Sequence, residues 1–524
     1  MKEKFKELLK DKLTLSALIL SAVWLIWYFA LGGAVFKNMW YTSPAIVFTG
    51  AVCALLPLAI EILNFLKLNK KWLSITVILI SPALILSYFF FFAFVLSKLT
   101  YFLIAGTPFF IAAGLLALAA FFIFLFPRLN KLWKKISAIS ISVVLLIICL
   151  FGVFNLTPFY ISGGATVFAV EDEYQIAFAT SHKSTGAVTV GDTTYYDATN
   201  GEKNVRTLHK ISVPAEELEN AKSYSITTQS VIFNTAYLPS NGMKITKDYS
   251  FRPVDESDGL QIYNLSDTHE VISGPASAAS YFGDKLDLLI LNGDIINDIS
   301  SEYQISLIYK LAHRITGGSI PVIYTRGNHE CNGYMAADLG KFVGSADGKF
   351  YYTVKVGSLS MLVLDTNNDM ADDNRLISPI ASFDPLRKEH SEWLKGMQGW
   401  NSGKYNFVIA HMAYPLSGYV KDSCAWSWWA KELITLTEGA DLALCGHSHR
   451  IDIQDADNGE NSAPYPVVRG SLRSNHRVHG EGVSNFEFTG TALEIKDGVI
   501  NIKFTNAKKK VVDEHVLGVF LSPL

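Results

Sequence analysis

Five apolar runs in the second half of the chain are each followed by histidine, aspartate or asparagine, and this pattern restricts the fold more than any other feature. The runs are LQIYNL (260–265), LDLLIL (286–291), IPVIYT (320–325), YNFVIA (405–410) and ADLALC (440–445). Helix-like stretches, 302–314 and 386–397, lie between them. Short apolar runs that alternate with amphipathic segments are typical of an α/β domain. The carboxyl ends of such strands share one edge of the sheet, where ligands bind.

The side chains that follow these runs are of metal-binding types. They are Asp267, His269, Asp294, Asn328, His329, His411, His447 and His449. Mixed sets of imidazoles and carboxylates suit manganese, iron or zinc. Seven of these residues, all but His329, are counted as ligands, and seven are too many for one tetrahedral zinc ion. We therefore expect two divalent metal ions that share a carboxylate, an arrangement used for displacement at phosphorus.

The order of these motifs is similar to the five blocks of the calcineurin-like metallophosphoesterases. The blocks are Asp267-Thr268-His269, Gly293-Asp294, Gly327-Asn328-His329-Glu330, His411 and Gly446-His447-Ser448-His449. The resemblance covers roughly residues 258–505. It implies a two-layered β core flanked by helices, with a dinuclear metal site at the strand ends.

The resemblance also implies a role for each residue of the site. Asp267, His269 and His449 would hold the first metal ion, Asn328, His411 and His447 the second, and Asp294 would bridge them. His329 would act near the leaving-group oxygen as general acid or transition-state stabiliser. The nucleophile would be a metal-bridging hydroxide.

The sequence departs from the common pattern three residues after the bridging aspartate. A carboxylate is usual at that position, but here Asn297 occupies it and Asp298 follows, so the partner of His329 stays open. Purple acid phosphatases carry a tyrosine there, so a purple iron–tyrosinate centre is not expected.

Two arginines that flank predicted metal ligands are candidate contacts for the substrate. Arg326 and Arg450 could each pair with phosphate oxygens, because guanidinium groups bind phosphate well. Asn328 is a third candidate. A structural ion pair is the alternative role for either arginine.

The first 160 residues contain five long apolar segments and lack the short alternating runs of the later chain. They lie at about 13–33, 44–66, 72–97, 101–126 and 136–158. Because about 20 apolar residues cross a bilayer, we predict five transmembrane helices. Lysine and arginine concentrate before the first segment and after the second and fourth, which predicts a cytoplasmic N-terminus. An integral plasma-membrane protein with an extracytoplasmic catalytic domain would follow.

Between these regions, residues 161–255 form short alternating apolar and polar runs rich in Val, Thr, Tyr and Ile. This pattern favours a β-sandwich and resembles the fibronectin-type sandwich that precedes the catalytic domain of purple acid phosphatases. The sequence thus predicts a multi-domain chain: a transmembrane region at 1–160, a sandwich at 161–255 and a phosphoesterase domain at 256–524.

Together these features predict a membrane-anchored metal-dependent phosphoesterase. Because five spans exceed what an anchor needs, lipid- or envelope-linked phosphates and the lipid bilayer are the expected partners. The net charge of -3 does not favour nucleic acid binding. The alternative is a catalytically inactive phosphoesterase fold that binds or senses a ligand. The choice between phosphomonoesters and phosphodiesters stays open.

Overall fold

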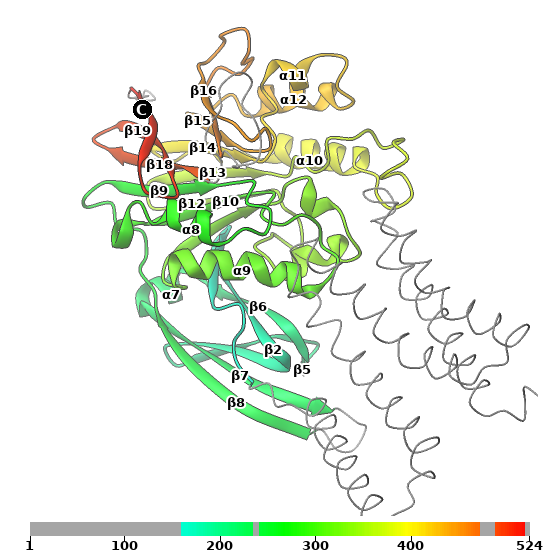
Figure 1. Cartoon of the computed structure of the whole chain (residues 1–524), viewed down its shortest axis with the longest axis vertical. Coiled ribbons are helices and arrows are strands. Elements are labelled where there is room, and N and C mark those ends of the chain that lie inside the picture. The colour runs from blue at the N-terminus through cyan, green and yellow to red at the C-terminus, as the bar shows by residue number, and fades with distance from the viewer. Residues whose placement is uncertain (1–158, 234–239, 472–487, 519–524) are drawn as a thin grey trace, which may run out of the picture. The chain divides into compact units, whose positions relative to one another are not determined.

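The computed structural model describes residues 159–233, 240–471 and 488–518. The chain divides into two compact units, Met1–Pro158 and Phe159–Leu524. The second unit contains the described residues, and its fold is shown in Figure 1.

The larger of the two main sheets has twelve strands, in the order β20-β19-β18-β9-β10-β11-β1-β2-β7-β8, with β3 and β6 also paired to β2. Its strands are β1 (Thr166–Val170), β2 (Glu173–Val190), β3 (Thr193–Tyr196), β6 (Arg206–Pro214), β7 (Ser223–Phe233), β8 (Ser240–Ser250), β9 (Leu260–Leu265), β10 (Leu288–Asn292), β11 (Pro321–Thr325), β18 (Thr489–Lys496), β19 (Val499–Asn506) and β20 (Val511–Leu517). A separate two-stranded ribbon pairs β4 (Ala198–Thr199) with β5 (Glu202–Lys203). At the centre of the large sheet, β9, β10 and β11 are parallel neighbours.

The smaller sheet has six strands in the order β12-β13-β14-β15-β17-β16. They are β12 (Tyr352–Val356), β13 (Leu359–Leu364), β14 (Tyr405–Ala410), β15 (Leu442–Cys445), β16 (Ile451–Gln454) and β17 (Val467–Gly470). Its centre is again parallel, because β13, β14, β15 and β17 run the same way. Every residue of β13, β14 and β15 is buried, as expected for parallel strands covered on both faces.

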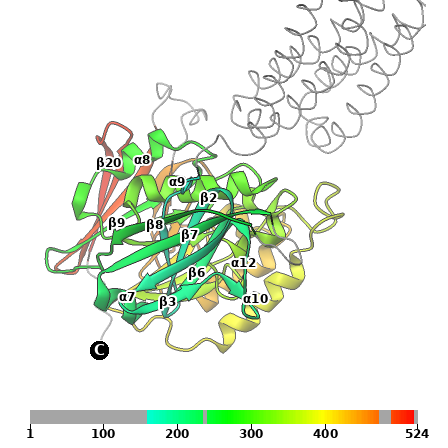
Figure 2. The ribbon, with the colours of Figure 1, turned by 90° about the horizontal axis from the view of Figure 1, so that it is seen from below.

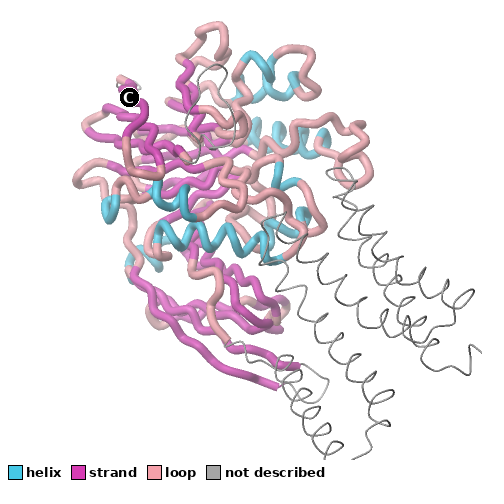
Figure 3. Tube along the Cα trace, viewed as in Figure 1, coloured by secondary structure: helices cyan, strands magenta, loops and turns pink. Residues whose placement is uncertain are grey.

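Helices cover the outer faces of both sheets (Figure 3). They are α7 (Ala215–Ala221), α8 (Ser273–Ala279), α9 (Glu302–Thr316), α10 (Asp384–Gly396), α11 (Ser417–Val420) and α12 (Ser427–Leu436), with 3₁₀ turns η4 (Gly283–Lys285), η5 (His329–Cys331) and η6 (Ala336–Lys341). The helices predicted at 302–314 and 386–397 are confirmed as α9 and α10, within two residues at each end. α9 buries Ile305, Ile308 and Leu311 on one face and ends at Gly317, whose positive φ of 63° terminates the helix.

The two sheets pack face to face around one apolar core. A single cluster of buried residues joins Ile290 and Val322 of the large sheet to Met361 and Phe407 of the small one. A second cluster lies between the small sheet and the helices α10 and α12, with Trp429 at its centre. The predicted two-layered β core flanked by helices is therefore present.

The N-terminal β-sandwich predicted for 161–255 is not confirmed. β1 pairs in parallel with β11, with Phe168 opposite Val322, so this segment continues the large sheet. Figures 1 and 2 show β2, β6, β7 and β8 running on from the core as one curved layer. Alternating hydrophobicity identified the strands correctly, but it does not specify the partner of a strand, and here the partner is the catalytic core.

The prediction of a five-helix transmembrane region is corrected. The five predicted spans lie outside the described residues. No helix in the described part of the chain is long and apolar enough to cross a membrane. The longest of these helices, α9, has 15 residues, against the roughly 20 that a bilayer requires. This finding contradicts the predicted fold class on this point, and with it the predicted integral-membrane localisation.

A buried histidine in α10 gives the fold a testable dependence on pH. His390 is 1% exposed, stacks on Tyr351 with ring centroids 4.3 Å apart, and has no hydrogen-bond partner at either ring nitrogen. Burial lowers the pKa of His390 from 6.5 to about 4. The group therefore favours the folded state most above pH 6.5. Below that pH the unfolded chain gains a proton that the folded chain does not accept until near pH 4.

We expect the free energy of unfolding to fall by about 1 kcal/mol for each pH unit in this window because of His390. His390→Phe should remove that contribution while it preserves the aromatic stack. Urea denaturation of both proteins at pH 7.5, 6 and 5 measures the difference. A difference between the two proteins that does not change with pH would show that the pKa of His390 is the same in the folded and unfolded chain, and so is not lowered by burial.

Candidate metal centre

The predicted site residues follow five strands of the two sheets and converge where these strands end. Asp267 and His269 follow β9, Asp294 follows β10, and Asn328 and His329 follow β11. From the smaller sheet, His411 follows β14, and His447 and His449 follow β15. The structure brings all eight together. Seven of them, all but Asn328, form three overlapping groups in which the ligand atoms of each group lie within 4.8 Å of one another: Asp267, His269 and His449; His269, Asp294 and His329; and Asp294, His411 and His447.

The first group is held together across the two sheets. His449 Nε2 lies 3.4 Å from Asp267 Oδ1 and 3.3 Å from His269 Nε2. Asp267 is fully buried, and its other oxygen, Oδ2, accepts hydrogen bonds from Ser266 Oγ and the backbone N–H of His447. Oδ1 is left without a hydrogen-bond partner. This orphaned carboxylate oxygen therefore faces two imidazole nitrogens.

The second group contains Asp294, His411 and His447. His411 Nε2 lies 3.3 Å from Asp294 Oδ2, and its Nδ1 donates to the backbone carbonyl of Asn292 at 2.7 Å. A carbonyl oxygen only accepts, so this bond fixes the proton on Nδ1. The Nδ1 of His447 lies 2.9 Å from Oδ1 of Asn328, which adds the amide oxygen to this group.

His329 lies at the rim of the site, with 39% of its side chain exposed. Its Nε2 is 3.9 Å from Asp294 Oδ2, while its Nδ1 donates to the backbone carbonyl of Asn297 at 2.9 Å. The partner of His329 is therefore this backbone carbonyl. Asp298 is instead bonded to Ser300.

Five of the predicted ligands have an unusual backbone conformation. Positive φ angles occur at Asp267 (56°), His269 (47°), Asp294 (52°), His447 (66°) and His449 (51°). A non-glycine residue in this region costs on the order of 1 kcal/mol or more, and such residues cluster at functional sites. The turns after β9, β10 and β15 are thus bent so that the side chains point into one space.

A buried carboxylate holds two of these turns together. Glu330 accepts the backbone N–H groups of Asp294 (2.9 Å), Ile295 (2.7 Å), Ile296 (3.3 Å) and Gly327 (2.9 Å). The turns come so close that a Cβ at Gly327 would lie 2.2 Å from Asp294 Oδ1. Only glycine fits at this position. Glu330 is the last residue of the Gly327-Asn328-His329-Glu330 motif, but the motif alone gave no role for it.

The charges of the site suit metal ions. Burial raises the pKa of Asp267 to about 7. Burial alone would also raise the pKa of Asp294, but the charges of His411 and His329 outweigh it and hold that pKa below its usual range. Conversely, burial would lower the pKa of His411, but Asp294 raises it. Buried carboxylates thus depend on positive charge nearby. Divalent cations bound by these oxygen and nitrogen atoms would supply it, and the residues present fit such ions.

The predicted substrate contacts differ in their placement. Arg326 is 11% exposed and pairs with Asp365. Its guanidinium nitrogen Nη2 lies 2.8 Å from Oδ2 of Asp365, and the guanidinium group stacks over the ring of Phe350. Its Nε and Nη2 groups are both engaged in this ion pair, so the structure favours the structural role. Arg450 is exposed and directly follows His449. Arg450 therefore stays the candidate for phosphate.

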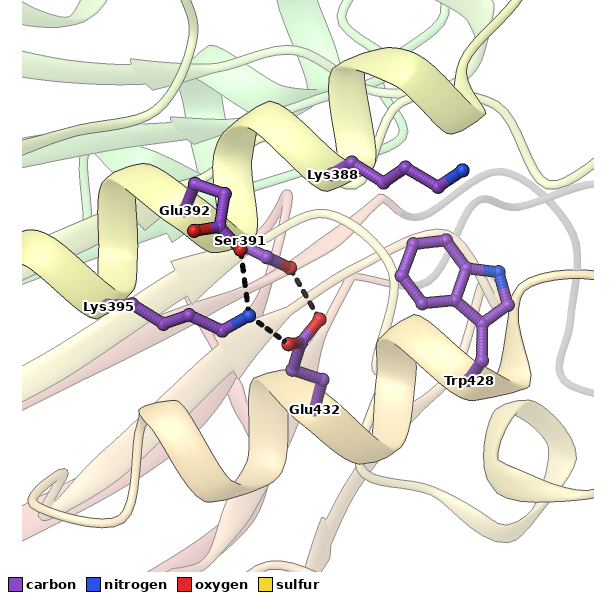
Figure 4. Close-up of a pocket in the computed structure, with 6 residues that line it drawn as sticks. All are labelled: Lys388, Ser391, Glu392, Lys395, Trp428 and Glu432. Atoms are coloured by element: carbon purple, nitrogen blue, oxygen red, sulfur yellow. Dashed lines mark hydrogen bonds and ion pairs between the residues drawn. The ribbon is translucent and has the colours of Figure 1, made fainter.

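A separate hollow lies between α10 and α12, away from the metal centre (Figure 4). It has a volume of about 400 Å³ and is lined by Lys388, Ser391, Glu392, Lys395, Trp428 and Glu432. Lys395 bonds to both Glu392 and Glu432, and Ser391 donates to Glu432. These contacts join the two helices, and none of the strand-end residues lines the hollow.

Comparison with known proteins supports the interpretation of the site. The family model described as calcineurin-like phosphoesterase matches residues 260–450, which include all eight strand-end residues. A search of curated proteins found no match. Among solved structures, the chain is similar to purple acid phosphatase PPD1 from yellow lupin (Lupinus luteus) seeds, with 13% identity and a TM-score of 0.46 over 68% of this chain and 74% of that chain. It is also similar to PhoD, with 12% identity and a TM-score of 0.41 over 70% of this chain and 90% of that one.

Residues 260–450 thus match the calcineurin-like phosphoesterase family. The chain is accordingly a metal-dependent enzyme that hydrolyses phosphate esters.

The role of Glu330 can be tested by its removal. Glu330→Ala would leave four buried N–H groups without an acceptor, and we expect the free energy of unfolding to fall by about 2–4 kcal/mol. Glu392→Ala, which removes a 74% exposed carboxylate from α10, should change it by less than about 1 kcal/mol. Urea denaturation followed by tryptophan fluorescence compares the two. Equal effects of the two substitutions would contradict the role of Glu330.

Proposed function

We propose that the enzyme hydrolyses phosphomonoester or phosphodiester bonds with two divalent metal ions, of manganese, iron or zinc, bound at the strand ends. The observation that supports this best is the position of Asp294, whose carboxylate belongs to groups on both sides of the site. Asp294 would bridge the ions. Asp267, His269 and His449 would hold the first ion, and Asn328, His411 and His447 the second. Bound ions of this kind activate water and neutralise charge on the phosphoryl oxygens.

His329 is suited to handle a proton at the leaving group. Its Nδ1–H is fixed by the carbonyl of Asn297, so in the imidazolium form the second proton resides on Nε2, and this is the proton that can pass to the substrate. Nε2 lies 3.9 Å from Oδ2 of Asp294, on a side chain that is 39% exposed. In this position His329 would protonate the departing oxygen, or stabilise the charge that develops on it.

Two residues of the site are candidate contacts for the substrate. Arg450 is the exposed guanidinium beside a predicted ligand, and we assign it to the phosphate oxygens of the substrate, together with Asn328. The lipid- or envelope-linked substrates expected from the sequence rested on the predicted spans, and they are not retained. Phosphomonoesters and phosphodiesters are both compatible with the ligand set.

Two substitutions separate metal binding from proton transfer. Asp294→Asn keeps the shape of the side chain but loses its charge, so we expect fewer than two bound metal ions per chain and loss of activity. His329→Ala should retain both ions, while kcat falls by about 10²–10⁴-fold. Elemental analysis of each purified protein, beside hydrolysis of bis(p-nitrophenyl) phosphate and p-nitrophenyl phosphate, measures both effects.

His515→Ala is the matched control, because this histidine lies on β20, where its Nε2 pairs with Asp513 of the same strand. It should behave as wild type in both assays. The proposal fails if the wild-type chain binds no metal, or if His329→Ala loses its ions as completely as Asp294→Asn does. The preferred substrate of the wild type distinguishes a monoesterase from a diesterase.

A further inference from the structure

A carboxylate that was not among the predicted site residues faces one of the predicted ligands. Asp369 lies in the loop that follows β13, and its Oδ2 is 4.0 Å from Nε2 of His447. The loop is held in place, since the N–H of Asn367 donates to Asp365 and the N–H of Met370 donates to Asn368. Asp369 itself is 42% exposed, so its side chain has room to approach the imidazole.

The two nitrogens of His447 point to different surroundings. Nδ1 lies 2.9 Å from Oδ1 of Asn328, among the ligands proposed for the second metal ion. Nε2 points the other way, toward Asp369. A ring nitrogen that gives its lone pair to a cation carries no proton. The proton must then reside on the other nitrogen, where it needs an acceptor.

Three other imidazoles of the site each have a partner on the nitrogen that is turned away from the centre. His411 Nδ1 bonds to the carbonyl of Asn292, and His329 Nδ1 to the carbonyl of Asn297. His269 Nδ1 lies 3.2 Å from the amide oxygen of Asn297. For His447 the group in the equivalent position is the carboxylate of Asp369.

We propose that Asp369 is a positioning residue for the metal centre. Its carboxylate accepts the Nε2–H of His447, and this contact fixes the tautomer and the orientation in which Nδ1 faces the ion held with Asn328 and His411. The inference rests on the proposed two-metal function. It adds a residue that acts through His447 and contacts neither ion nor substrate. Partners of this kind change metal affinity by about 10- to 100-fold when removed.

The test compares metal binding by four forms of the full chain: wild type, Asp369→Ala, Asp369→Asn and Asp373→Ala. Asp373 lies in the same loop, is exposed, and carries the same charge, so it is the matched control. Metal is removed by chelation, Mn²⁺ is titrated back, and free and bound ions are counted at each step. Melting temperatures of the four metal-free proteins are recorded beside the titrations.

We expect Asp369→Ala to weaken one of two manganese sites by about 10- to 100-fold and to leave the other unchanged. Asp369→Asn should bind almost as the wild type does, because an amide oxygen can still accept the Nε2–H. Asp373→Ala should also match the wild type. The metal-free proteins should melt at the same temperature, since the contact matters only for the ion.

Three results would overturn the inference in different ways. If Asp369→Ala binds two ions with wild-type affinity, Asp369 does not position His447. If Asp369→Asn or Asp373→Ala is weakened as much as Asp369→Ala, the effect is one of net charge alone. If the wild-type chain itself fails to bind two ions, the proposed two-metal function fails, and this inference with it.

Discussion

The buried carboxylate of Glu330 is the interaction on which the arrangement of the metal centre depends. Four backbone N–H groups from the turns after β10 and β11 converge on it. Without such an acceptor, the strained turn at Asp294 would leave unpaired N–H groups in the protein interior. Burial, and then the charge of Asp294, raise the pKa of Glu330. Because the carboxylates of Glu330 and Asp294 lie so close together, nearby positive charge from His411 or from metal ions stabilises the site.

The topology of the sheets explains why distant motifs meet at one place. β9, β10 and β11 are adjacent and parallel in one sheet, and β14 and β15 are adjacent and parallel in the other. The two sheets pack face to face, so their carboxyl ends open on the same space. Asp267 and His449 come from different sheets and are 182 positions apart in sequence, yet their ligand atoms are 3.4 Å apart. A change in the packing of the sheets would therefore separate the two halves of the site.

Much of this arrangement could be predicted from the sequence, because polar residues directly after buried parallel strands must lie at one edge. The positions of Asp267, Asp294 and His411 follow from that rule alone. The partner of His329 could not be predicted, since it is the backbone carbonyl of Asn297. Every residue has such a carbonyl, so the residue type does not identify it. Asp369 follows its strand by five residues, too far for the rule to place it.

Other features of the structure differ from what the sequence predicted. The strands of 161–255 have a pattern that fits a sandwich, but β1 pairs with β11, and pairing between strands is not encoded in alternation. Arg326 was predicted as a candidate contact for phosphate because it lies near Asn328 in the sequence. In the structure, Asp365, 39 positions later, pairs with it and neutralises its charge. The apolar segments before residue 159 lie outside the described residues. Among the described residues, no helix is long and apolar enough to cross a membrane.

The central claim is that the strand-end residues form one centre in which Asp294 bridges two metal ions. Electron paramagnetic resonance of the manganese-loaded chain tests it most directly, because two Mn²⁺ ions about 3.5–4 Å apart couple magnetically. At two equivalents of manganese we expect the spectrum of a spin-coupled pair. A spectrum that shows only isolated Mn²⁺ ions at this stoichiometry would contradict it.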